Sequence, residues 1–394
     1  MLINLIVDGN YVFHQEYAIF SGWAKSGGFP TEREEVEFLR GVAVKFFYAV
    51  NNLPINGKVI FTFDSRSWRK AVEIPGGGYK SKRNKGDEKG GMDEETAMKF
   101  FSLMEEFGKY LSRVGVIVSR ISGAEGDDLI YRWSERFYND GQSTIIISGD
   151  RDLTQLVRMD GEKWTIQWNN KKNGKRIQNT MFVPEGWGLW LGEESEMSIF
   201  NFTISDDKQA FLKLIRDQNI TMEVVYPDEV VMDKILAGDD GDDVPPVWTA
   251  MVPNKKGKKR AVRMTGKKPG LVMDFLCEKY DIERKNILSM WKDRSFMDDC
   301  AGLVLRVTKD VDGSNEREIV KDAMERNAKL VWLNSEMMPY NLVAEMDMHI
   351  DDALLNNESR RNLWNLKDLF DCSRFANAAP PKKSDPFYGM KIPE

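Results

Sequence analysis

Short apolar runs alternate with amphipathic stretches in the N-terminal part of the chain. The runs lack the polar alternation of a half-exposed sheet, which is typical of strands buried on both faces. They are residues 2–7, 59–63, 114–118 and 144–147. Apolar positions at helical spacing fill the intervals, at residues 34–50, 94–111 and 129–137. This alternation predicts an α/β domain with a parallel sheet over residues 1–181.

Other segments depart from this pattern. Residues 66–91 carry glycine clusters, which predicts a mobile arch that leaves the sheet edge. Residues 182–229 are acidic, rich in tryptophan and without a clear period, so we interpret them as an inserted segment. Residues 230–375 are helical in character, and residues 376–394 are expected to form a flexible tail.

The charge balance is acidic, because 56 Lys and Arg face 62 Asp and Glu, for a net charge of −6. This argues against a surface that coats nucleic acid as a whole, but not against local basic patches. Three cysteines and two histidines do not suit a zinc site, so oxygen ligands for Mg²⁺ or Mn²⁺ are favoured. The first apolar run is too short for a signal peptide or membrane span, and we expect a cytosolic protein without membrane contact.

Acidic residues follow the predicted strands. They are Asp8, Asp64, Glu125, Asp127, Asp128, Asp150 and Asp152. In an open parallel sheet the ligand site lies beyond the carboxyl ends of the strands, so these side chains are expected to meet. Such a negative pocket requires divalent cations or bound protons.

Each acid alone also has a structural interpretation. Ser122 and Glu125 fit a capping box, and the two acids after Glu125 suit a helix N-terminus. Asp150 fits an N-cap, and GDDGDD at residues 238–243 fits a capping glycine with a solvated acidic turn. The joint order of the acids, rather than any one of them, favours a metal site.

Six motifs occur in a characteristic order. They are VDGN at Asp8, FTFDS at Asp64, YKSKRNK at Tyr79, AEGDDLI at Glu125, SGDRDLTQL at Asp150 and KILAGDDGDDVP at Lys234. With them the sequence resembles the structure-specific 5′ nucleases, the flap endonucleases and 5′-3′ exonucleases, and among these most closely the ribonuclease H group of T-even bacteriophages. The resemblance covers residues 1–160 and 230–300. It implies a PIN-like α/β nuclease domain followed by a mainly helical duplex-binding region.

The resemblance also implies two Mg²⁺ ions, for which Mn²⁺ can substitute. The implied ligands of the first ion are Asp8, Asp64 and Asp127, with Glu125 between the two sites. Those of the second are Asp150, Asp152, Asp239 and Asp242, with Asp128 beside them. In the family such ions activate a water and polarise the scissile phosphate.

Two basic segments are expected to bind nucleic acid. In the first, Tyr79, Lys80, Lys82 and Arg83 match the family's arch, which admits a single-stranded 5′ end. Its charge and its tyrosine suit phosphate binding and base stacking, and the alternative is a solvated loop. Arg69, upstream of Tyr79 in the same segment, is expected to touch the scissile phosphate.

The second basic segment follows a departure from the family pattern. VPPVW stands where the family has a glycine-rich hairpin that grips duplex, and Asp243 replaces the usual Asn. The acid-free stretch 254–268 is predicted to compensate by binding phosphates. Its predicted contacts are Lys255, Lys256, Lys258, Lys259, Arg260 and Arg263.

The predicted function is therefore a magnesium-dependent 5′ nuclease acting on branched or nicked duplex DNA and RNA–DNA hybrid, with RNA primer removal as its task. We expect a monomer whose tail, at residues 384–389, docks a sliding clamp or a single-strand DNA-binding protein, or packs on its own domain. Two other functions remain open: a PIN-type ribonuclease, which is usually shorter and lacks the arch, and a non-catalytic DNA-junction-binding protein, which need not keep the acids.

Overall fold

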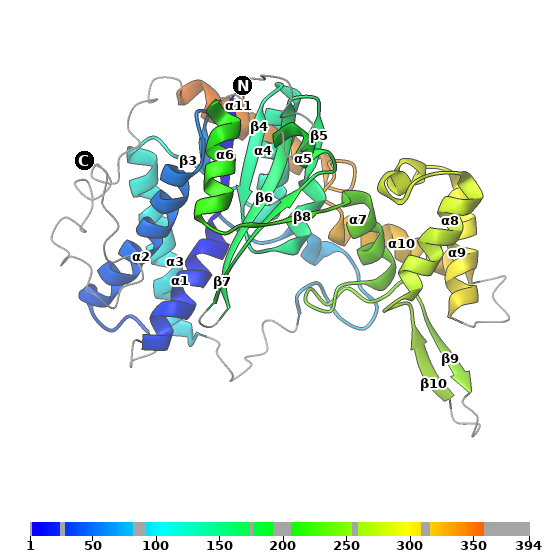
Figure 1. Cartoon of the computed structure of the whole chain (residues 1–394). Coiled ribbons are helices and arrows are strands. Elements are labelled where there is room, and N and C mark those ends of the chain that lie inside the picture. Colours follow the sequence, from blue (N-terminus) through cyan, green and yellow to red (C-terminus); the bar gives the residue numbers. More distant parts are fainter. Residues whose placement is uncertain are drawn as a thin grey trace, which may run out of the picture.

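A mixed eight-stranded sheet organises the N-terminal part of the chain (Figure 1). The computed structural model describes residues 2–23, 28–81, 92–173, 176–191, 206–253, 259–308 and 316–357. The strands are β1 (Ile3–Asp8), β2 (Val59–Thr62), β3 (Ile117–Ser119), β4 (Ser143–Ile147), β5 (Arg158–Asp160), β6 (Lys163–Asn173), β7 (Arg176–Val183) and β8 (Thr221–Val224). Their order is β3-β2-β1-β4-β6-β7-β8, with β5 paired to β6.

The four predicted strands are confirmed as a parallel array. β1 pairs in parallel with β2 and β4, and β2 pairs in parallel with β3. β3 begins later than the apolar run suggested, because Val114 caps the preceding helix and Gly115 turns the chain with φ 87°. The mainly parallel sheet and the α/β class therefore agree with the prediction.

Helices cover both faces of this sheet. They are α1 (Gly9–Trp23), α2 (Glu32–Asn52), α3 (Glu94–Arg113), α4 (Gly126–Asn139), α5 (Trp187–Leu191) and α6 (Asp206–Asp217). Leu5 and Val7 of β1 belong to the core formed with α1, α2 and α3. Ile6 belongs to the core on the other face, with Leu129 and Trp133 of α4. This burial on both faces explains the continuous apolar run.

The segment predicted as an insertion extends the same sheet. β6 and β7 form an antiparallel hairpin that precedes the segment except for the end of β7, and β8, which lies within the segment, adds in parallel to β7. Trp164, Trp187 and Trp190 pack around Phe211 of α6, with ring centroids 4.8 to 6.1 Å apart. Trp187 and Trp190 of this segment are thus core residues, as is Trp164 of β6, and the segment's lack of periodicity concealed this.

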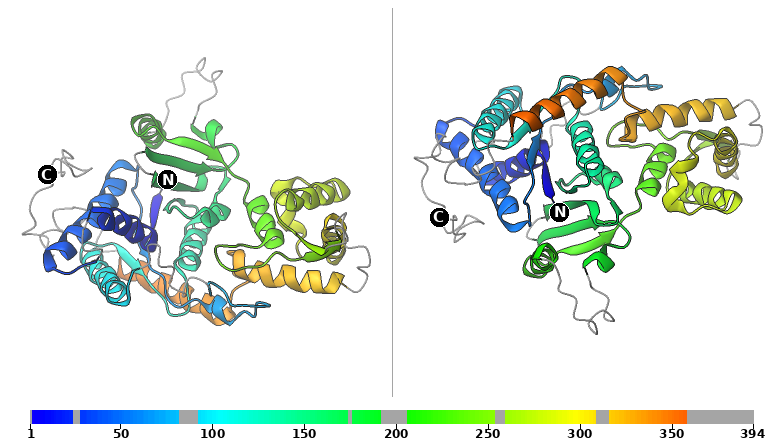
Figure 2. Two further views of the ribbon diagram at one scale, coloured as in Figure 1. Left: turned by 90° about the horizontal axis from the view of Figure 1, so that it is seen from below. Right: turned by 90° about the horizontal axis from the view of Figure 1, so that it is seen from above.

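The C-terminal part is mainly helical, and its described residues between 227 and 331 lie to one side of the sheet domain (Figure 2). Its elements are α7 (Pro227–Ala237), β9 (Thr249–Pro253), β10 (Lys259–Arg263), α8 (Lys268–Tyr280), α9 (Arg294–Val307), α10 (Arg317–Val331) and α11 (Tyr340–Asn356). Short 3₁₀ helices complete the fold: η1 (Trp68–Ala71), η3 (Arg151–Leu156) and η5 (Arg284–Met290). None of the helices described is long and apolar enough to cross a membrane.

The region 230–375, predicted as one helical region, does not form a single unit in the structure. Helix α11 returns to the sheet domain, where Leu342, Met346 and Ile350 share the core of α4. Arg132 of α4 pairs with Asp347 of α11 at 2.5 Å. The predicted tail and its docking segment lie outside the described residues.

A buried asparagine holds the helical part together near the acids. Asn327 of α10 is fully buried, and its Nδ2 donates to the carbonyls of Ile235 and Pro245, each at 2.9 Å. These two carbonyls flank the turn at residues 239–244, which carries predicted ligands. Asn327 therefore ties the end of α7 to the residue that follows the turn.

We expect Asn327→Ala to lower the free energy of unfolding by about 2–4 kcal/mol, because two buried carbonyls lose their donor. Urea denaturation followed by circular dichroism measures this change. Lys329→Ala, an exposed position on the same helix, is the matched control and should change stability by less than about 0.5 kcal/mol. Equal effects of the two substitutions would contradict the assigned role.

Candidate metal and nucleic-acid site

Asp8 ends β1 and begins α1. Its Oδ1 accepts the backbone N–H of Tyr11 at 2.9 Å, and its Oδ2 accepts the hydroxyl of Ser148 at 2.7 Å. The following Gly9 has no room for a side chain, because a Cβ would lie 2.5 Å from the carbonyl oxygen of Thr62. This close approach fixes the carboxylate at the edge where β1 and β2 end.

Asp64 follows β2 and is held by two neighbours. Asn10 donates its amide to Asp64 Oδ2 at 2.5 Å and accepts the Asp64 backbone N–H at 3.1 Å. The backbone N–H of Gly126, at the start of α4, donates to Asp64 Oδ1 at 2.5 Å. Asp64 is therefore tied to both the β1 end and the α4 N-terminus.

Asp150 follows β4 and is the N-cap of η3. Its side chain accepts the backbone N–H of Asp152 at 2.9 Å, and its own N–H donates to the Ser148 hydroxyl at 3.1 Å. Gln167 of β6 donates to the Asp150 carbonyl at 2.7 Å. The predicted capping role is thus observed, and the carboxylate still lies at the sheet edge with the other acids.

Asp8, Asp64, Asp127 and Asp150 form what we call the first acidic cluster. Burial raises the pKa of Asp8 to about 7, and the charges of Asp64 and Asp150 add to this shift. Burial also raises the pKa of Asp127 well above its usual range, followed by repulsion from Asp150, Asp8 and Asp64. These four carboxylates therefore lie within electrostatic reach of one another, as the positions at the strand ends predicted.

The N-terminus of α4 is held by a buried ion pair. Asp128, fully buried, receives both Nη atoms of Arg69, at 2.7 and 3.1 Å, and the indole N–H of Trp68 at 3.2 Å. Arg69 also binds Glu125 at 2.9 Å. The capping box forms between Glu125 and Asp128 rather than between Ser122 and Glu125.

One predicted role needs correction here. Arg69 is 2% exposed, so its guanidinium is committed to the α4 acids and does not reach a scissile phosphate in this arrangement. Asp128 has both oxygens occupied by protein donors, which is consistent with its expected position beside the predicted ligands. Sequence spacing placed both near the acids, but it could not show which acid the guanidinium would pair with.

The first half of the arch is ordered against the acids. Tyr79 is 5% exposed, and its hydroxyl lies 2.8 Å from Asp242 and 3.1 Å from Glu125. The expected stacking of a base on Tyr79 is therefore not available in this arrangement. Lys80, with φ 54°, places its ammonium 2.5 Å from Glu125 and 3.6 Å from Asp242. Although burial acts to raise the pKa of Glu125, the charges of Lys80 and Arg69 lower it overall.

The remaining acids meet a lysine that sequence reasoning left without a role. Lys234, near the end of α7, forms ion pairs with Asp152 and, at 2.5 Å, with Asp239. Burial and the charge of Asp150 raise the pKa of Asp152 to about 6, although Lys234 opposes the shift. We call Asp152 and Asp239 the second acidic pair.

The donor set of the first acidic cluster fits a hard divalent cation. Carboxylate oxygens are the preferred ligands of Mg²⁺ and Mn²⁺. Burial, followed by repulsion from neighbouring acids, raises the pKa values of Asp8 and Asp127, and a bound cation would offset both effects. Within the described ranges, no three Asp, Glu, His or Cys side chains are already arranged as a metal site. The cluster thus has the right ligands and charge, but its side chains are not in ligating geometry.

The predicted nucleic-acid contacts are divided. Lys259, Arg260 and Arg263 lie on β10, where all three are exposed. Lys80 lies beside the acids. The other predicted contacts lie outside the described residues: Lys82, Arg83, Lys255, Lys256 and Lys258.

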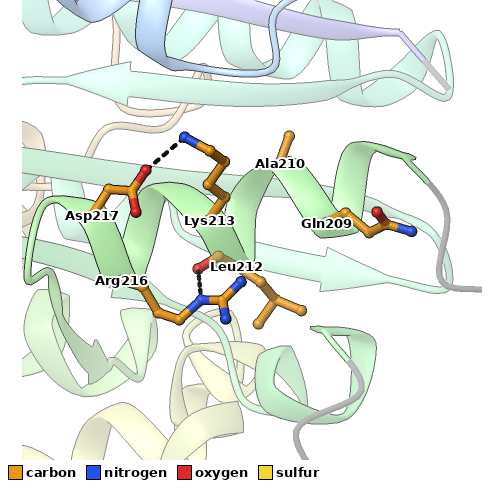
Figure 3. Close-up of a pocket in the computed structure, with 6 residues that line it drawn as sticks. All are labelled: Gln209, Ala210, Leu212, Lys213, Arg216 and Asp217. Carbon is orange, nitrogen blue, oxygen red and sulfur yellow. Dashed lines mark hydrogen bonds and ion pairs between the residues drawn. The ribbon is translucent and has the colours of Figure 1, made fainter.

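A surface hollow on α6 is a different feature (Figure 3). It is lined by Gln209, Ala210, Leu212, Lys213, Arg216 and Asp217. Lys213 pairs with Asp217 at 2.6 Å, and Arg216 donates to the Leu212 carbonyl at 3.2 Å. No predicted site residue lines the hollow, and its charged groups are paired within the helix.

Sequence reasoning missed three residues that position the acids. Asn10 orients Asp64, Ser148 bridges Asp8 and the Asp150 backbone, and Lys234 joins the second acidic pair. Each lies within five residues of a predicted ligand in the sequence. A search for short polar residues close to the acids would have found Asn10 and Ser148, and a search for nearby cations would have found Lys234.

The raised pKa of Asp8 makes metal-free stability depend on pH. Between pH 3.8 and about 7 the folded state keeps a proton that the unfolded state has lost, so the free energy of unfolding falls as the pH rises. The loss from Asp8 is at most roughly 4 kcal/mol. Urea unfolding in chelator at pH 4.5, 6 and 7.5 measures it.

Asp8→Asn should make this pH profile less steep, because the amide does not titrate, whereas Asp127 and Asp152 still contribute to it. Asp160→Asn, at an exposed position on β5, is the control and should leave the profile as in the wild type. Parallel profiles for the wild type and Asp8→Asn would contradict the assigned burial of this carboxylate.

Solved structures with a similar course of the chain come from bacteriophage T5. One is a T5 protein co-crystallised with metal ions, with 14% identity, a TM-score of 0.45, and coverage of 94% of this chain and 98% of that one. Another is the T5 flap endonuclease in a pseudo-enzyme-product complex with DNA and metal ions, with 14% identity, a TM-score of 0.47, and coverage of 90% and 99%. A mutant of the T5 5′-exonuclease gives 14% identity, a TM-score of 0.46, and coverage of 91% and 100%.

Comparison with curated proteins gave no match. Comparison with protein families gave one. Residues 4–185, which contain the sheet from β1 to β7 and the first acidic cluster, match the family of the 5′-3′ exonuclease N-terminal, resolvase-like domain.

Proposed function

We propose that this chain is a metal-dependent 5′ nuclease that hydrolyses phosphodiester bonds near the 5′ end of branched or nicked duplex. The observation that carries the proposal is the first acidic cluster at the carboxyl edge of the sheet, inside the segment that matches the exonuclease domain. The motif resemblance to the ribonuclease H group of T-even phages supports RNA–DNA hybrid as a further substrate and primer removal as the task. A non-catalytic role is disfavoured, because an idle site gains nothing from the repulsion of these acids.

Asp8, Asp64 and Asp127 would hold the first cation. Asp150, which the resemblance placed with the second ion, would join them because its charge acts strongly on Asp127, and Asp152 and Asp239 would take part in a second site. When bound, Mg²⁺ or Mn²⁺ would lower the pKa of a coordinated water and stabilise the negative charge on the reacting phosphate. The protein's own contribution is orientation. Asn10 and the Gly126 N–H fix Asp64, and Ser148 fixes Asp8.

Lys80 is the cation best placed to meet the substrate. Its ammonium lies beside Glu125 and Asp242 and is about 20% exposed, so it is near the acids and accessible to a phosphate. The segment that carries it is anchored, because its backbone N–H donates to the Asp242 carbonyl at 3.0 Å. We propose that Lys80 binds the phosphate next to the scissile bond and holds it against the first acidic cluster.

Asp150→Asn should reduce cleavage of an end-labelled 5′-flap DNA in Mg²⁺ by at least about 100-fold, because the amide removes a charged ligand. Asn is also a good N-cap, so η3 and the fold should be retained. Gel-shift binding of the same flap in chelator should stay close to that of the wild type.

Asp160→Asn serves as the matched control, since it makes the same chemical change on the exposed strand β5. An RNA–DNA hybrid and a single-stranded RNA are assayed in parallel. Retained magnesium-dependent cleavage by Asp150→Asn would contradict the site, and cleavage of the single-stranded RNA alone would favour a PIN-type ribonuclease.

The hairpin β9–β10 is proposed as the duplex-binding element. It projects from the helical part of the molecule (Figure 1), and its strands of five residues span about 16 Å each. The segment from residue 244 to 273 contains no acid and eight Lys or Arg. A two-stranded ribbon of this charge can lie along a DNA groove and neutralise phosphates on both sides.

The register of the hairpin places cations on both of its faces. Lys259 and Arg263 pair with Pro253 and Thr249, whereas Arg260 is offset by one residue and lies on the opposite face. The base of the hairpin is anchored by Met264, which is fully buried in the helical core. The cations are therefore carried on a fixed support rather than on a free loop.

The double substitution Arg260→Gln and Arg263→Gln should weaken duplex binding and reduce the slope of log Kd against log salt by about 2, because two phosphate contacts are lost. Fluorescence anisotropy between 50 and 200 mM KCl, in chelator, measures the slope. The double substitution Lys213→Gln and Arg216→Gln on α6 removes the same charge elsewhere and should leave the slope unchanged. Identical slopes for all three proteins would contradict a role for the hairpin.

A further inference from the structure

Lys234 bridges two acids that come from different parts of the chain. Asp152 lies in η3, at the edge of the sheet, whereas Asp239 lies in the turn after α7. The Lys234 ammonium forms ion pairs with both, and it is only about 20% exposed. One protein cation therefore occupies the space between the two carboxylates.

The turn that brings Asp239 close to Lys234 has a conformation fixed by its glycine and by hydrogen bonds. Gly238 ends α7 with φ 75°, and a Cβ there would lie 2.3 Å from the Val244 carbonyl oxygen. Asp239 and Val244 then exchange two backbone hydrogen bonds of 2.8 Å. The Gly241 N–H donates to Asp239 Oδ1 at 2.8 Å, so the other oxygen, Oδ2, faces Lys234.

The first acidic cluster is compensated differently. In the part of the chain that the structure describes, no Lys or Arg forms an ion pair with Asp8, Asp64, Asp127 or Asp150. Their partners are neutral donors, such as Ser148 and Asn10. A divalent cation can enter the first cluster without displacing a protein cation, but at the second acidic pair it must first displace an ammonium.

We infer that Lys234 is the resident counter-cation of the second acidic pair, so that this chain binds one divalent cation tightly, at the first acidic cluster, and a second only by displacing the lysine. The inference rests on the proposed function, since it concerns the metals of the same site. It assigns Lys234 a positioning role: the ammonium keeps Asp152 and Asp239 together when the second cation is absent.

Isothermal titration of Mn²⁺ into the full, chelator-treated chain without DNA tests the inference. The wild type should show one tight site and a second that is at least about 10-fold weaker. Lys234→Gln should strengthen the second site by about 10-fold or more, because the neutral amide does not compete for the carboxylates. Lys234→Arg, which keeps the charge, should leave it weak, as should the distant control Lys213→Gln.

A double variant tests whether the strengthened site lies at the second acidic pair. Adding Asp152→Asn to Lys234→Gln should abolish the strengthened site and leave the tight site unchanged. Circular dichroism melting verifies that the variants are folded, and the wild-type titration can still overturn the inference if Lys234→Gln does not fold. Two equally tight sites in the wild type, or an unchanged second site in Lys234→Gln, would overturn the inference.

The titration also separates this inference from the proposed function. A wild type that binds two cations equally and cleaves flap DNA overturns the role of Lys234 alone. A wild type that binds no divalent cation and does not cleave contradicts both.

Discussion

Repulsion among carboxylates at one sheet edge is the constraint on which the rest of the site depends. Adjacent parallel strands end side by side, so β1, β2 and β4 deliver Asp8, Asp64 and Asp150 to the same place. Burial removes the water that would screen these charges, and repulsion grows as the local dielectric falls. Neutral hydrogen-bond donors stabilise the carboxylates of the first acidic cluster, and Arg69, Lys80 and Lys234 form ion pairs with the acids around it. The centre of the site is thus left negative, and its periphery is neutralised.

The same peripheral contacts join the sheet domain to the helical part. Tyr79 packs in the helical core, and its hydroxyl binds both Glu125 of the sheet domain and Asp242 of the turn after α7. Lys80 and Lys234 each pair with one acid from either side. Because these links are ionic or polar, the charge at the acidic edge acts directly on the contact between the two parts. A cation or phosphate bound at this edge would therefore change the strength of the contact between the sheet domain and the helical part.

Local pattern predicted the elements that depend on neighbours in sequence. β1, β2 and β4, and the acids that follow them, could be found because buried parallel strands are continuous apolar runs and their ends share one edge. Long-range packing was not accessible in this way. The burial of Tyr79 and Arg69, the addition of β8 to the sheet, and the return of α11 to α4 depend on contacts between distant residues. The basic and aromatic composition of the segment suggested that Tyr79 and Arg69 face the solvent. In the structure both are buried, because they bind acidic residues on other elements.

A net charge of −6 is compatible with DNA binding because the charges act over short distances. At physiological salt the screening length is about 8 Å, so a phosphate responds to the nearest side chains and not to the sum over the chain. The hairpin β9–β10 presents Lys259, Arg260 and Arg263 on a stretch without acids. The first acidic cluster repels phosphate until cations enter it. Under the proposed function, the basic hairpin would hold duplex whether or not metal is present, whereas approach of the scissile phosphate to the acids would depend on the metal.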